Sequence, residues 1–585
     1  MGRVESWLWM GMLSGLAALP APGWSQTCPA PSVDPGGDPD VMDHVRYLAD
    51  DALAGRGVAT DGERCAAAYV ANVFEALGLT PSGDGGSFFQ SFDVRTGSEI
   101  SSTGALTISS GAVGGNPWGL SEREWRPYGF SGSGEVEGAL VYAGEGLARP
   151  GQEGGEELPP MEGKIVVVEA RTGGVSSGDL YADPHFKGTV AQGRGAAALI
   201  LLDDELPLPD PAREDRPFLR IPVVAVTGAA ASQLRETARA GAEAQLSAET
   251  RPALSEARNV VALLEGSDPA RADEVVVVGA HYDHLGMGGA GSLAPGQVAI
   301  HNGADDNASG TAALLEVARN LSQGAAPTRP VLFIAFSGEE RGLLGSGHYV
   351  REPTVPLDEA VAMLNMDMVG RLRDGRLTVF GLGTAPEWEG ILQAANASLA
   401  EPFTLTLAPD GYGPSDHSSF YGLGIPVLHF FTNTHSEYHR PEDDFETING
   451  AGLERVATLV GLVAAEVAGA GAASTAAPDL SLVEAEPPQP SESGGRGYGP
   501  YFGSIPDMGS QVYGVRITGV REGSPADAAG LQGGDVIVGF GGDEVGDLYA
   551  YTYALRERKP GDAVDVIVMR DDRRLTLQAV LGERR

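Results

Sequence analysis

The feature of this sequence that most constrains its fold is a repeated succession of strand, loop and helix between Asn259 and Ala470. Strands are predicted at Val260–Leu264, Glu274–Gly279, Val331–Phe336, Ala360–Leu364 and Val427–Phe431. Most of these are continuous apolar runs, which is the pattern of strands covered by helices on both faces. A helix is predicted over Thr311–Leu321, because its leucines and alanines recur on one side. We therefore expect an α/β domain built on a mixed, mostly parallel sheet flanked by helices.

Two further helices are predicted ahead of this domain. One runs from Asp40 to Leu53, with apolar residues on one face. The glycines Gly55 and Gly57 end it. A second helix extends from about Gly62 to Leu77 and stops at Gly78, as helices commonly do at glycine.

The chain is long enough for several domains. Its 585 residues exceed what one hydrophobic core usually serves. We expect a signal peptide at 1–25, the N-terminal part of the α/β domain at 26–115, an inserted α+β domain at 116–255, the main part of the α/β domain at 256–470, a linker at 471–496 and a β-rich domain at 497–585. The linker is indicated by its Ala, Pro, Glu and Ser content.

The N-terminus has the pattern of a secretory signal. Arg3 gives a weak positive start, and an apolar run follows over Trp7–Leu19. That run is shorter than the roughly 20 residues that a membrane-spanning helix needs. Small residues at Gly23 and Ser25 fit a cut before Gln26. We expect export to the periplasm or the medium, with no integral membrane segment after cleavage.

Both cysteines, Cys28 and Cys65, lie after the predicted cut. In an oxidising compartment a disulfide between them is plausible, and it would tie the mature N-terminus to the second helix. The alternative is two unpaired thiols. A lipid anchor at Cys28 is disfavoured, because the three residues before it lack the usual apolar, small pattern.

The charge of the chain excludes some partners. The 40 basic and 79 acidic residues give a net charge of −39. A nucleic acid partner is excluded on this ground, because binding a polyanion needs clustered cations. Adsorption to anionic lipid is disfavoured for the same reason.

Polar residues follow the predicted strands of the α/β domain one after another. They are His281, Asp306, Glu340, Asp367 and His439, each in a loop that follows a strand or opens a helix. In open α/β sheets, ligands bind beyond the carboxyl ends of the strands, so these five loops are expected to converge. Two imidazoles and several carboxylates without a thiolate suit zinc or a neighbouring divalent ion. Five ligands are too many for one catalytic zinc and fit two ions that share a carboxylate.

Two neighbours of these residues have a role in the same chemistry. Glu339 and Glu340 are adjacent, so one can bind metal while the other takes a proton from the attacking water. Asp283, two residues after His281, is placed to accept the imidazole N–H and fix its tautomer.

These residues together resemble peptidase family M28, a family of zinc aminopeptidases. The resemblance rests on the runs His281–His284, Gly303–Gly310, Phe336–Glu340, Asn365–Met368, Ser415–His417 and Tyr438–Pro441, which occur in the family's order. It implies a zinc exopeptidase fold and two Zn²⁺ ions per chain.

The resemblance also implies a role for each residue. Asp306 bridges the two ions, His281 and Asp367 complete one site, and Glu340 and His439 complete the other. Glu339 is the general base, Asp283 supports the site, and Tyr438 or Tyr412 stabilises the oxyanion. Asp416 and His417 shape the pocket. We treat His284, His301, His429 and His435 as non-ligands, with His435 the alternative to His439.

The other two domains carry weaker resemblances. The inserted segment resembles a protease-associated domain through Glu162–Val167 and Gly195–Ile200. The C-terminal segment resembles a PDZ domain through Tyr501–Gly503 and Gly523–Asp535. We expect such a domain to bind peptide C-termini as an added strand. The alternative is that it packs against the peptidase domain or inhibits it.

The expected function is hydrolysis of peptides or proteins, with removal of N-terminal residues by a metal-bridged hydroxide and Glu339 as base. A carboxypeptidase and a glutaminyl cyclase of the same fold are the alternatives within the family. The cyclase is disfavoured because it would need only one zinc. A catalytically inactive peptide-binding receptor or adaptor is the alternative from another class, and the intact Glu339 argues against it.

Overall fold

The computed structural model describes most of the chain from residue 28 to residue 582. The residues between these limits that it leaves undescribed are 101–103, 110–116, 146–157, 172–182, 206, 212–215, 217, 290, 295–296, 471–476, 484–499, 507–512, 522, 547–549, 552–553, 556–557 and 571–572. The predicted signal and most of the predicted linker lie outside the described residues. Within the described part, no helix is long and apolar enough to cross a membrane.

The largest sheet has nine strands, and its centre is parallel. The parallel strands are β13 (Val331–Phe336), β12 (Val276–His281), β14 (Ala362–Met366) and β17 (Val427–Phe431). One edge is formed by β11 (Thr250–Leu264), with β1 (Thr80–Pro81) and β2 (Phe89–Ile100) antiparallel to it. The other edge is formed by β15 (Arg376–Phe380) and β16 (Thr404–Leu407). The predicted α/β class is confirmed.

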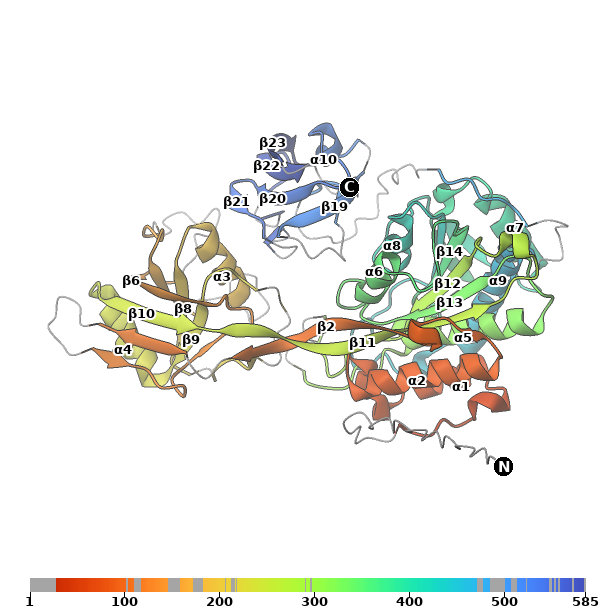
Figure 1. Cartoon of the computed structure of the whole chain (residues 1–585), viewed down its shortest axis with the longest axis horizontal. Coiled ribbons are helices and arrows are strands. Elements are labelled where there is room, and N and C mark those ends of the chain that lie inside the picture. Colours follow the sequence, from red (N-terminus) through yellow and green to blue (C-terminus); the bar gives the residue numbers. More distant parts are fainter. Residues whose placement is uncertain are drawn as a thin grey trace, which may run out of the picture.

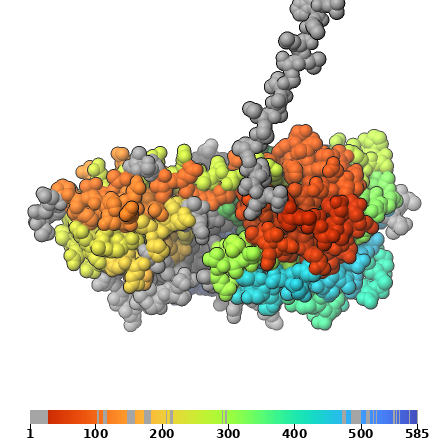
Figure 2. Space-filling view, turned by 90° about the horizontal axis from the view of Figure 1, so that it is seen from below, coloured from red at the N-terminus to blue at the C-terminus, as the bar shows by residue number. Residues whose placement is uncertain are grey.

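Helices cover both faces of this sheet. Alternate residues of each strand point to opposite faces, so both faces carry apolar side chains that the helices bury. Val276, Val278 and Ala280 join one core, and Val277 joins the other. The first core is closed by α1 (Val41–Leu48), α2 (Asp61–Ala76), α5 (Gly310–Gln323), α7 (Trp388–Ser398) and α9 (Gly450–Ala468). The second is closed by α6 (Leu344–Arg351) and α8 (His417–Tyr421). In the view from below, the N-terminal helices form a continuous surface on the large domain (Figure 2).

A long two-stranded ribbon of β2 and β11 leads from the large sheet to a second, eight-stranded sheet (Figure 1). The strands of that sheet are β3 (Ala105–Ile108), β4 (Trp118–Gly119), β5 (Trp125–Pro127), β6 (Gly134–Tyr142), β7 (Ile165–Glu169), β8 (Ala198–Asp203), β9 (Val223–Thr227) and β10 (Glu243–Ala248). Helices α3 (Pro184–Gly193) and α4 (Gly228–Arg239) accompany them. The sheet includes β3, which lies ahead of the boundary expected at residue 116.

The third sheet forms the C-terminal domain around its own core. Its elements are β18 (Ser504–Pro506), β19 (Val515–Val520), α10 (Pro525–Ala528), β20 (Val536–Phe540), β21 (Asp543–Glu544), β22 (Ala563–Arg570) and β23 (Arg573–Val580). Strand β18 lies at one edge of the described strands. The predicted β-rich character of this domain is confirmed.

The carboxyl ends of the parallel strands lie on the side of the large sheet that faces the inserted domain. Strand β11 enters that sheet from the inserted domain and runs antiparallel to β13. The parallel strands therefore run toward the inserted domain, and their carboxyl ends lie on that side.

The C-terminal domain lies beside both other domains (Figure 1), with ion pairs from Glu544 to Arg220 and from Arg521 to Asp410.

Two details of the N-terminal region can be compared with expectation. The predicted disulfide between Cys28 and Cys65 is confirmed. The first helix is shorter than predicted, because α1 ends at Leu48 and Asp50 caps a separate 3-10 turn over Asp51–Arg56. The second helix, α2, matches the prediction to within a residue at each end.

Candidate metal centre

The five predicted ligands come from five segments at the carboxyl edge of the parallel strands. His281 is the last residue of β12, and Asp367 directly follows β14. Asp306 lies in the helical turn Ala304–Ser309 that precedes α5. Glu340 follows β13, and His439 lies in the loop after β17. The structure brings all five together.

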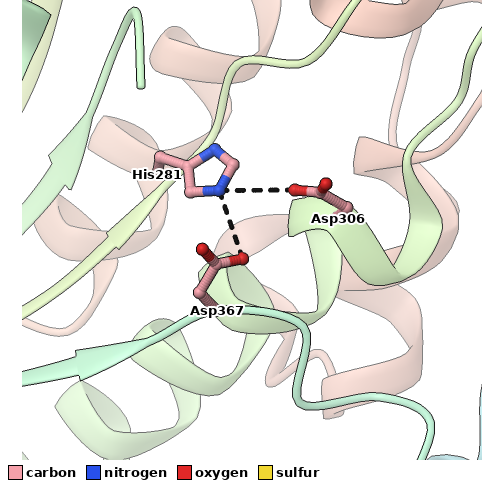
Figure 3. A group of neighbouring side chains, drawn as sticks. All are labelled: His281, Asp306 and Asp367. Atoms are coloured by element: carbon pink, nitrogen blue, oxygen red, sulfur yellow. Dashed lines mark hydrogen bonds and ion pairs between the residues drawn. The ribbon is translucent and has the colours of Figure 1, made fainter. Parts of the chain in front are cut away.

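His281 belongs to one half of this cluster (Figure 3). Its Nε2 lies 3.3 Å from Oδ1 of Asp367 and 3.4 Å from Oδ1 of Asp306. The three side chains are almost completely buried. Each offers one atom that could hold a metal ion.

His439 belongs to the other half. Its Nε2 lies 3.1 Å from Oε2 of Glu340 and 3.2 Å from Oδ2 of Asp306. Asp306 thus presents one carboxylate oxygen to each histidine. A carboxylate in this position is suited to bridge two cations.

The distances fit ligands of a tetrahedral ion. Atoms bound to one zinc at roughly 2.0–2.1 Å lie about 3.3 Å apart at tetrahedral angles. The four separations from Nε2 of His281 and of His439 to the carboxylate oxygens span 3.1–3.4 Å. The other ring nitrogens have partners of their own, since Nδ1 contacts the carbonyl oxygen of Asp283 at 3.2 Å in His281 and that of Gly291 at 2.8 Å in His439. When both Nδ1 atoms carry the proton, both Nε2 lone pairs face carboxylates, and a cation must lie between them.

The electrostatics of the cluster point the same way. Burial lowers the pKa of His281, but the carboxylates of Asp367 and Glu339 outweigh it and hold that pKa well above its usual range. For His439, hydrogen bonds to Asp306 and Glu340 outweigh burial and raise the pKa to about 11. Burial also raises the pKa of Glu339. The cluster therefore concentrates negative charge that demands a positive ion, either protons or metal.

His284 lies closer to the cluster than the sequence suggested. We expected a non-ligand, and its Nδ1 contacts Oε1 of Glu340 at 2.6 Å. With Asp306 and Glu340 it forms a second group that could hold a metal ion. The distance of 2.6 Å is that of a hydrogen bond and is shorter than the separation expected between two ligands of one ion. The geometry therefore favours His439 as the ligand and His284 as the residue that orients Glu340.

Asp283 and Glu339 are linked differently from expectation. The carboxylate of Asp283 lies 3.7 Å from Nδ1 of His281, farther than its own backbone carbonyl. Its Oδ1 instead accepts the backbone N–H of Glu339 at 3.1 Å. The carboxylate of Glu339 reaches to 3.9 Å from Nε2 of His281. Asp283 thus fixes both the imidazole, through its carbonyl group, and the backbone of the predicted base.

The two candidate tyrosines lie in different surroundings. The ring of Tyr438 stacks on His439 with centroids 3.9 Å apart, and burial together with the charge of Asp306 raises the pKa of its hydroxyl. The ring of Tyr412 packs edge-on against Tyr421 at 4.6 Å, and its backbone N–H is held by Asp410.

The remaining predicted pocket residues and non-ligands stay outside the two triads. Asp416 is buried, and burial raises its pKa to about 7. His417 stacks on His429 at 4.3 Å. His435 lies 3.3 Å from Asp305, and His301 contacts the carbonyl oxygen of Ala299 and the hydroxyl of Ser292.

Two residues behind the site had no assigned role in the sequence. The guanidinium of Arg56 is fully buried and donates to the carbonyl oxygens of Leu48, Tyr282, Asn302 and Gly303. Asp443 accepts the backbone N–H groups of Asp305 and Asp306 at 3.0 and 3.1 Å. The sequence signals near Arg56 were the break at Gly55–Gly57 and the resemblance of the segment 53–56 to the N-terminal part of the M28 family. Asp443 lies four residues after His439, and the sequence assigned it no role.

The fold and this buried set of histidines and carboxylates are suited to bind metal ions at one edge of an α/β sheet. Residues 259–464 match the family model for peptidase family M28. Residues 136–234 match the PA domain, and residues 489–581 match the PDZ domain. The three predicted resemblances are confirmed.

The chain is also similar to individual proteins. It is 31% identical over 314 residues to aminopeptidase YwaD of Bacillus subtilis, covering 51% of this chain and 61% of that protein. It is 28% identical over 475 residues to the probable lipoprotein aminopeptidase LpqL of Mycobacterium tuberculosis, covering 73% and 85%. The solved structure of BSAP, a zinc aminopeptidase from Bacillus subtilis, has 24% identity and a TM-score of 0.46, covering 75% of this chain and 97% of that one. The chain spans 53–61% of the length of the first three curated relatives.

Proposed function

We propose that this protein is an exported, two-zinc aminopeptidase that removes N-terminal residues from peptides. The observation that carries the proposal is the position of Asp306, whose two carboxylate oxygens face His281 and His439 at 3.4 and 3.2 Å. Relatives named as aminopeptidases support the activity. The predicted signal at the N-terminus supports export.

His281 and Asp367 would hold one ion, Glu340 and His439 the other, and Asp306 both. When bound, such a pair polarises a substrate carbonyl and lowers the pKa of an attacking water. The protein holds both imidazoles in one tautomer through their Nδ1 contacts and keeps Glu340 oriented through His284.

Glu339 is the proposed general base. Its backbone is fixed by Asp283, and its carboxyl group is buried beside the cluster. Burial favours the protonated form, so this carboxyl group can accept a proton from water and return it to the leaving amine. Tyr438 and Tyr412 remain the two candidates for stabilising the oxyanion, and the stacking of Tyr438 on His439 favours Tyr438.

The charge around the cluster favours an aminopeptidase over a carboxypeptidase. Buried carboxyl groups of Asp283, Glu339 and Asp416 border the ligands. In their ionised form these carboxyl groups attract the cationic α-amine of a substrate and repel a C-terminal carboxylate, which needs a positive partner. The guanidinium of Arg56 lies behind the site and is engaged by backbone carbonyl groups.

The C-terminal domain is proposed to bind peptide C-termini beside its edge strand β18. PDZ domains take up a peptide as an added strand, with the backbone supplying the hydrogen bonds. The position of β18 at the edge of the described strands supports this use.

The test measures metal and activity on one preparation. Purified protein is expected to hold about two zinc ions per chain and to lose activity with a chelator. It should cleave free-amine peptides and C-blocked peptides but not N-blocked ones. Glu339→Gln should keep its zinc and lose about 10²- to 10⁴-fold in kcat. Glu352→Gln, at an exposed position after α6, is the matched control and should behave as wild type. Cleavage of N-blocked peptides from their C-terminus, or a fully active Glu339→Gln, would refute the proposal.

A further inference from the structure

The loop that leads from β16 to α8 borders the metal centre. Its Ser415 accepts a hydrogen bond from Asn365 at 2.8 Å, and Asn365 lies in β14, two residues before Asp367. Asp416 lies buried next to it, within electrostatic reach of His281. A shift of this loop therefore moves one group that hydrogen-bonds β14 beside Asp367 and one that interacts electrostatically with His281.

Asp410 holds the beginning of this loop with both of its side-chain oxygens. Oδ1 accepts the backbone N–H of Tyr412 at 3.0 Å, which closes a tight turn of the Asx type. Its own carbonyl oxygen accepts the N–H of Gly381 at 2.8 Å, so the backbone of Asp410 is anchored to the large domain. The other side-chain oxygen, Oδ2, is ion-paired with Arg521 of the PDZ domain. The Asp410 side chain is 12% exposed.

Arg521 is held within the PDZ domain by backbone hydrogen bonds to residues just before β18 and at the start of α10. Its backbone N–H donates to the carbonyl oxygen of Gly503 at 2.8 Å, and Gly503 directly precedes β18. Its carbonyl oxygen accepts the N–H of Ser524, the residue that caps α10. Arg521 therefore connects this part of the PDZ domain to the loop of the catalytic domain.

We propose that Asp410 is a positioning residue for the peptidase reaction, and that Arg521 of the PDZ domain holds it in place. The inference rests on the proposed function, because the positioned loop carries Ser415 and Asp416, which border the proposed metal ligands. The PDZ domain then has a structural role, because it holds this loop of the catalytic domain in place through Arg521. This role is separate from any binding of peptides.

Arg521 restrains the side chain of Asp410. A carboxylate that accepts one N–H and faces a guanidinium has both oxygens fixed, whereas without Arg521 it can rotate toward water. The loop that depends on it then samples more positions, and small displacements of groups near reacting atoms reduce turnover. Binding of a small substrate would change little, because the groups that would hold its amine and carbonyl stay present.

The experiment compares full-length variants with zinc bound. Arg521→Ala removes the ion pair, and Asp410→Asn removes the charge while leaving an oxygen for the N–H of Tyr412. Each should lower kcat on an aminoacyl anilide about three- to tenfold, with KM changed less than about twofold. The double variant should lose no more than either single one, because both break the same interaction. Arg521→Lys should recover most of kcat.

Arg220→Ala is the matched control. It breaks the ion pair of the PDZ domain with the PA domain, through Glu544, and leaves Asp410 untouched. It should keep the wild-type kcat. If Arg220→Ala and Arg521→Ala lowered kcat equally, general docking of the PDZ domain would explain the effect, and the proposal would be wrong.

A second readout does not depend on activity. Hydrogen exchange of the Tyr412 amide should be faster by about tenfold in Arg521→Ala than in wild type, and unchanged in Arg220→Ala. If the wild-type protein cleaved no peptide, the proposed function would fail while this comparison still tested the restraint. Equal exchange in all three proteins would overturn the inference.

Discussion

At the scale of single residues, His439 and His284 meet the same carboxylate from different distances. His439 faces Oε2 of Glu340 at 3.1 Å, whereas His284 faces Oε1 at 2.6 Å. The longer distance leaves room for an ion between the two atoms, and the shorter one is filled by a hydrogen bond. One glutamate can therefore serve as a ligand through one oxygen and be oriented through the other.

This difference predicts different effects of removing each imidazole. His439→Ala should bind about one zinc per chain instead of two, because it loses a ligand of one site. His284→Ala should keep both ions but lose about 10- to 100-fold in affinity for one of them, since it removes only a supporting hydrogen bond. Metal analysis after dialysis, followed by a chelator titration, measures both effects.

The control for this pair is His301→Ala, whose ring contacts the hydroxyl of Ser292 and the carbonyl oxygen of Ala299 outside the cluster. It should match wild type in zinc content and affinity. Retention of both ions by His439→Ala with loss of one by His284→Ala would reverse the assignment.

The sequence predicted the ligands because each follows a strand or opens a helix, and the order of those elements is readable. It did not predict Arg56 or Asp443, whose hydrogen bonds join segments far apart in the chain. A buried guanidinium that donates hydrogen bonds to four carbonyl groups produces no periodic pattern in the sequence. The same holds for His284, whose distance to Glu340 depends on how two loops pack.

At the scale of elements, the first turn of α2 is joined to the loop after β13 through Glu63. This side chain is 1% exposed and accepts the N–H of Ala59 at 2.6 Å and the hydroxyl of Ser337. Burial raises the pKa of Glu63 to about 8. A carboxyl group that is kept protonated in the folded state makes stability depend on pH.

The direction in which the free energy of unfolding changes with pH follows from proton binding. Between about pH 4.5 and pH 8 the folded protein keeps the Glu63 proton and the unfolded chain releases it. The free energy of unfolding therefore falls as pH rises through this window, by at most about 1.4 kcal/mol per pH unit, and this contribution is constant above it. Glu63→Gln does not titrate, so its stability relative to wild type should rise from pH 5 to pH 8. Denaturant unfolding at several pH values, with zinc at saturation, measures the difference.

Glu75→Gln provides the matched control, because Glu75 is exposed on the same helix. Its stability relative to wild type should not change with pH. A parallel pH profile for Glu63→Gln and wild type would contradict the proposed burial effect.

The elements show where sequence patterns suffice and where they do not. The apolar runs predicted β13 and β17 with their bounds, because β13 is buried throughout and β17 is buried at all residues but its last. Strand β11 was predicted only over its last five residues, since Thr250–Asn259 belongs to a partly exposed ribbon with no apolar run. Strands β15 and β16 were missed. Strand β16 is a short edge strand without a buried residue, and the buried run of β15 is limited to its centre.

At the scale of the whole molecule, charged contacts join the PDZ domain to both other domains. The PDZ domain reaches the PA domain through Arg220 and Glu544 and the catalytic domain through Arg521 and Asp410. Their side chains are between 12 and 52% exposed, and pairs of this kind leave no signal in a single sequence. The sequence predicted three domains and could not predict how they meet.

The net charge of −39 has a consequence for every substrate that approaches the metal centre. A strongly acidic surface raises the local concentration of cationic peptides and lowers that of anionic ones. Between about 10 mM and about 100 mM salt the Debye length falls from about 30 Å to about 10 Å, which removes most of this long-range effect.

The test uses three C-blocked tripeptides with the same N-terminal residue and with Lys, Gln or Glu at the third position. Over this range kcat/KM for the Lys peptide should fall about threefold or more, that for the Glu peptide should rise, and the Gln peptide reports any effect of salt on the enzyme itself. A single salt dependence shared by all three peptides would show that the acidic surface does not steer substrates, and would leave the local carboxylates around Glu339 as the source of any charge preference.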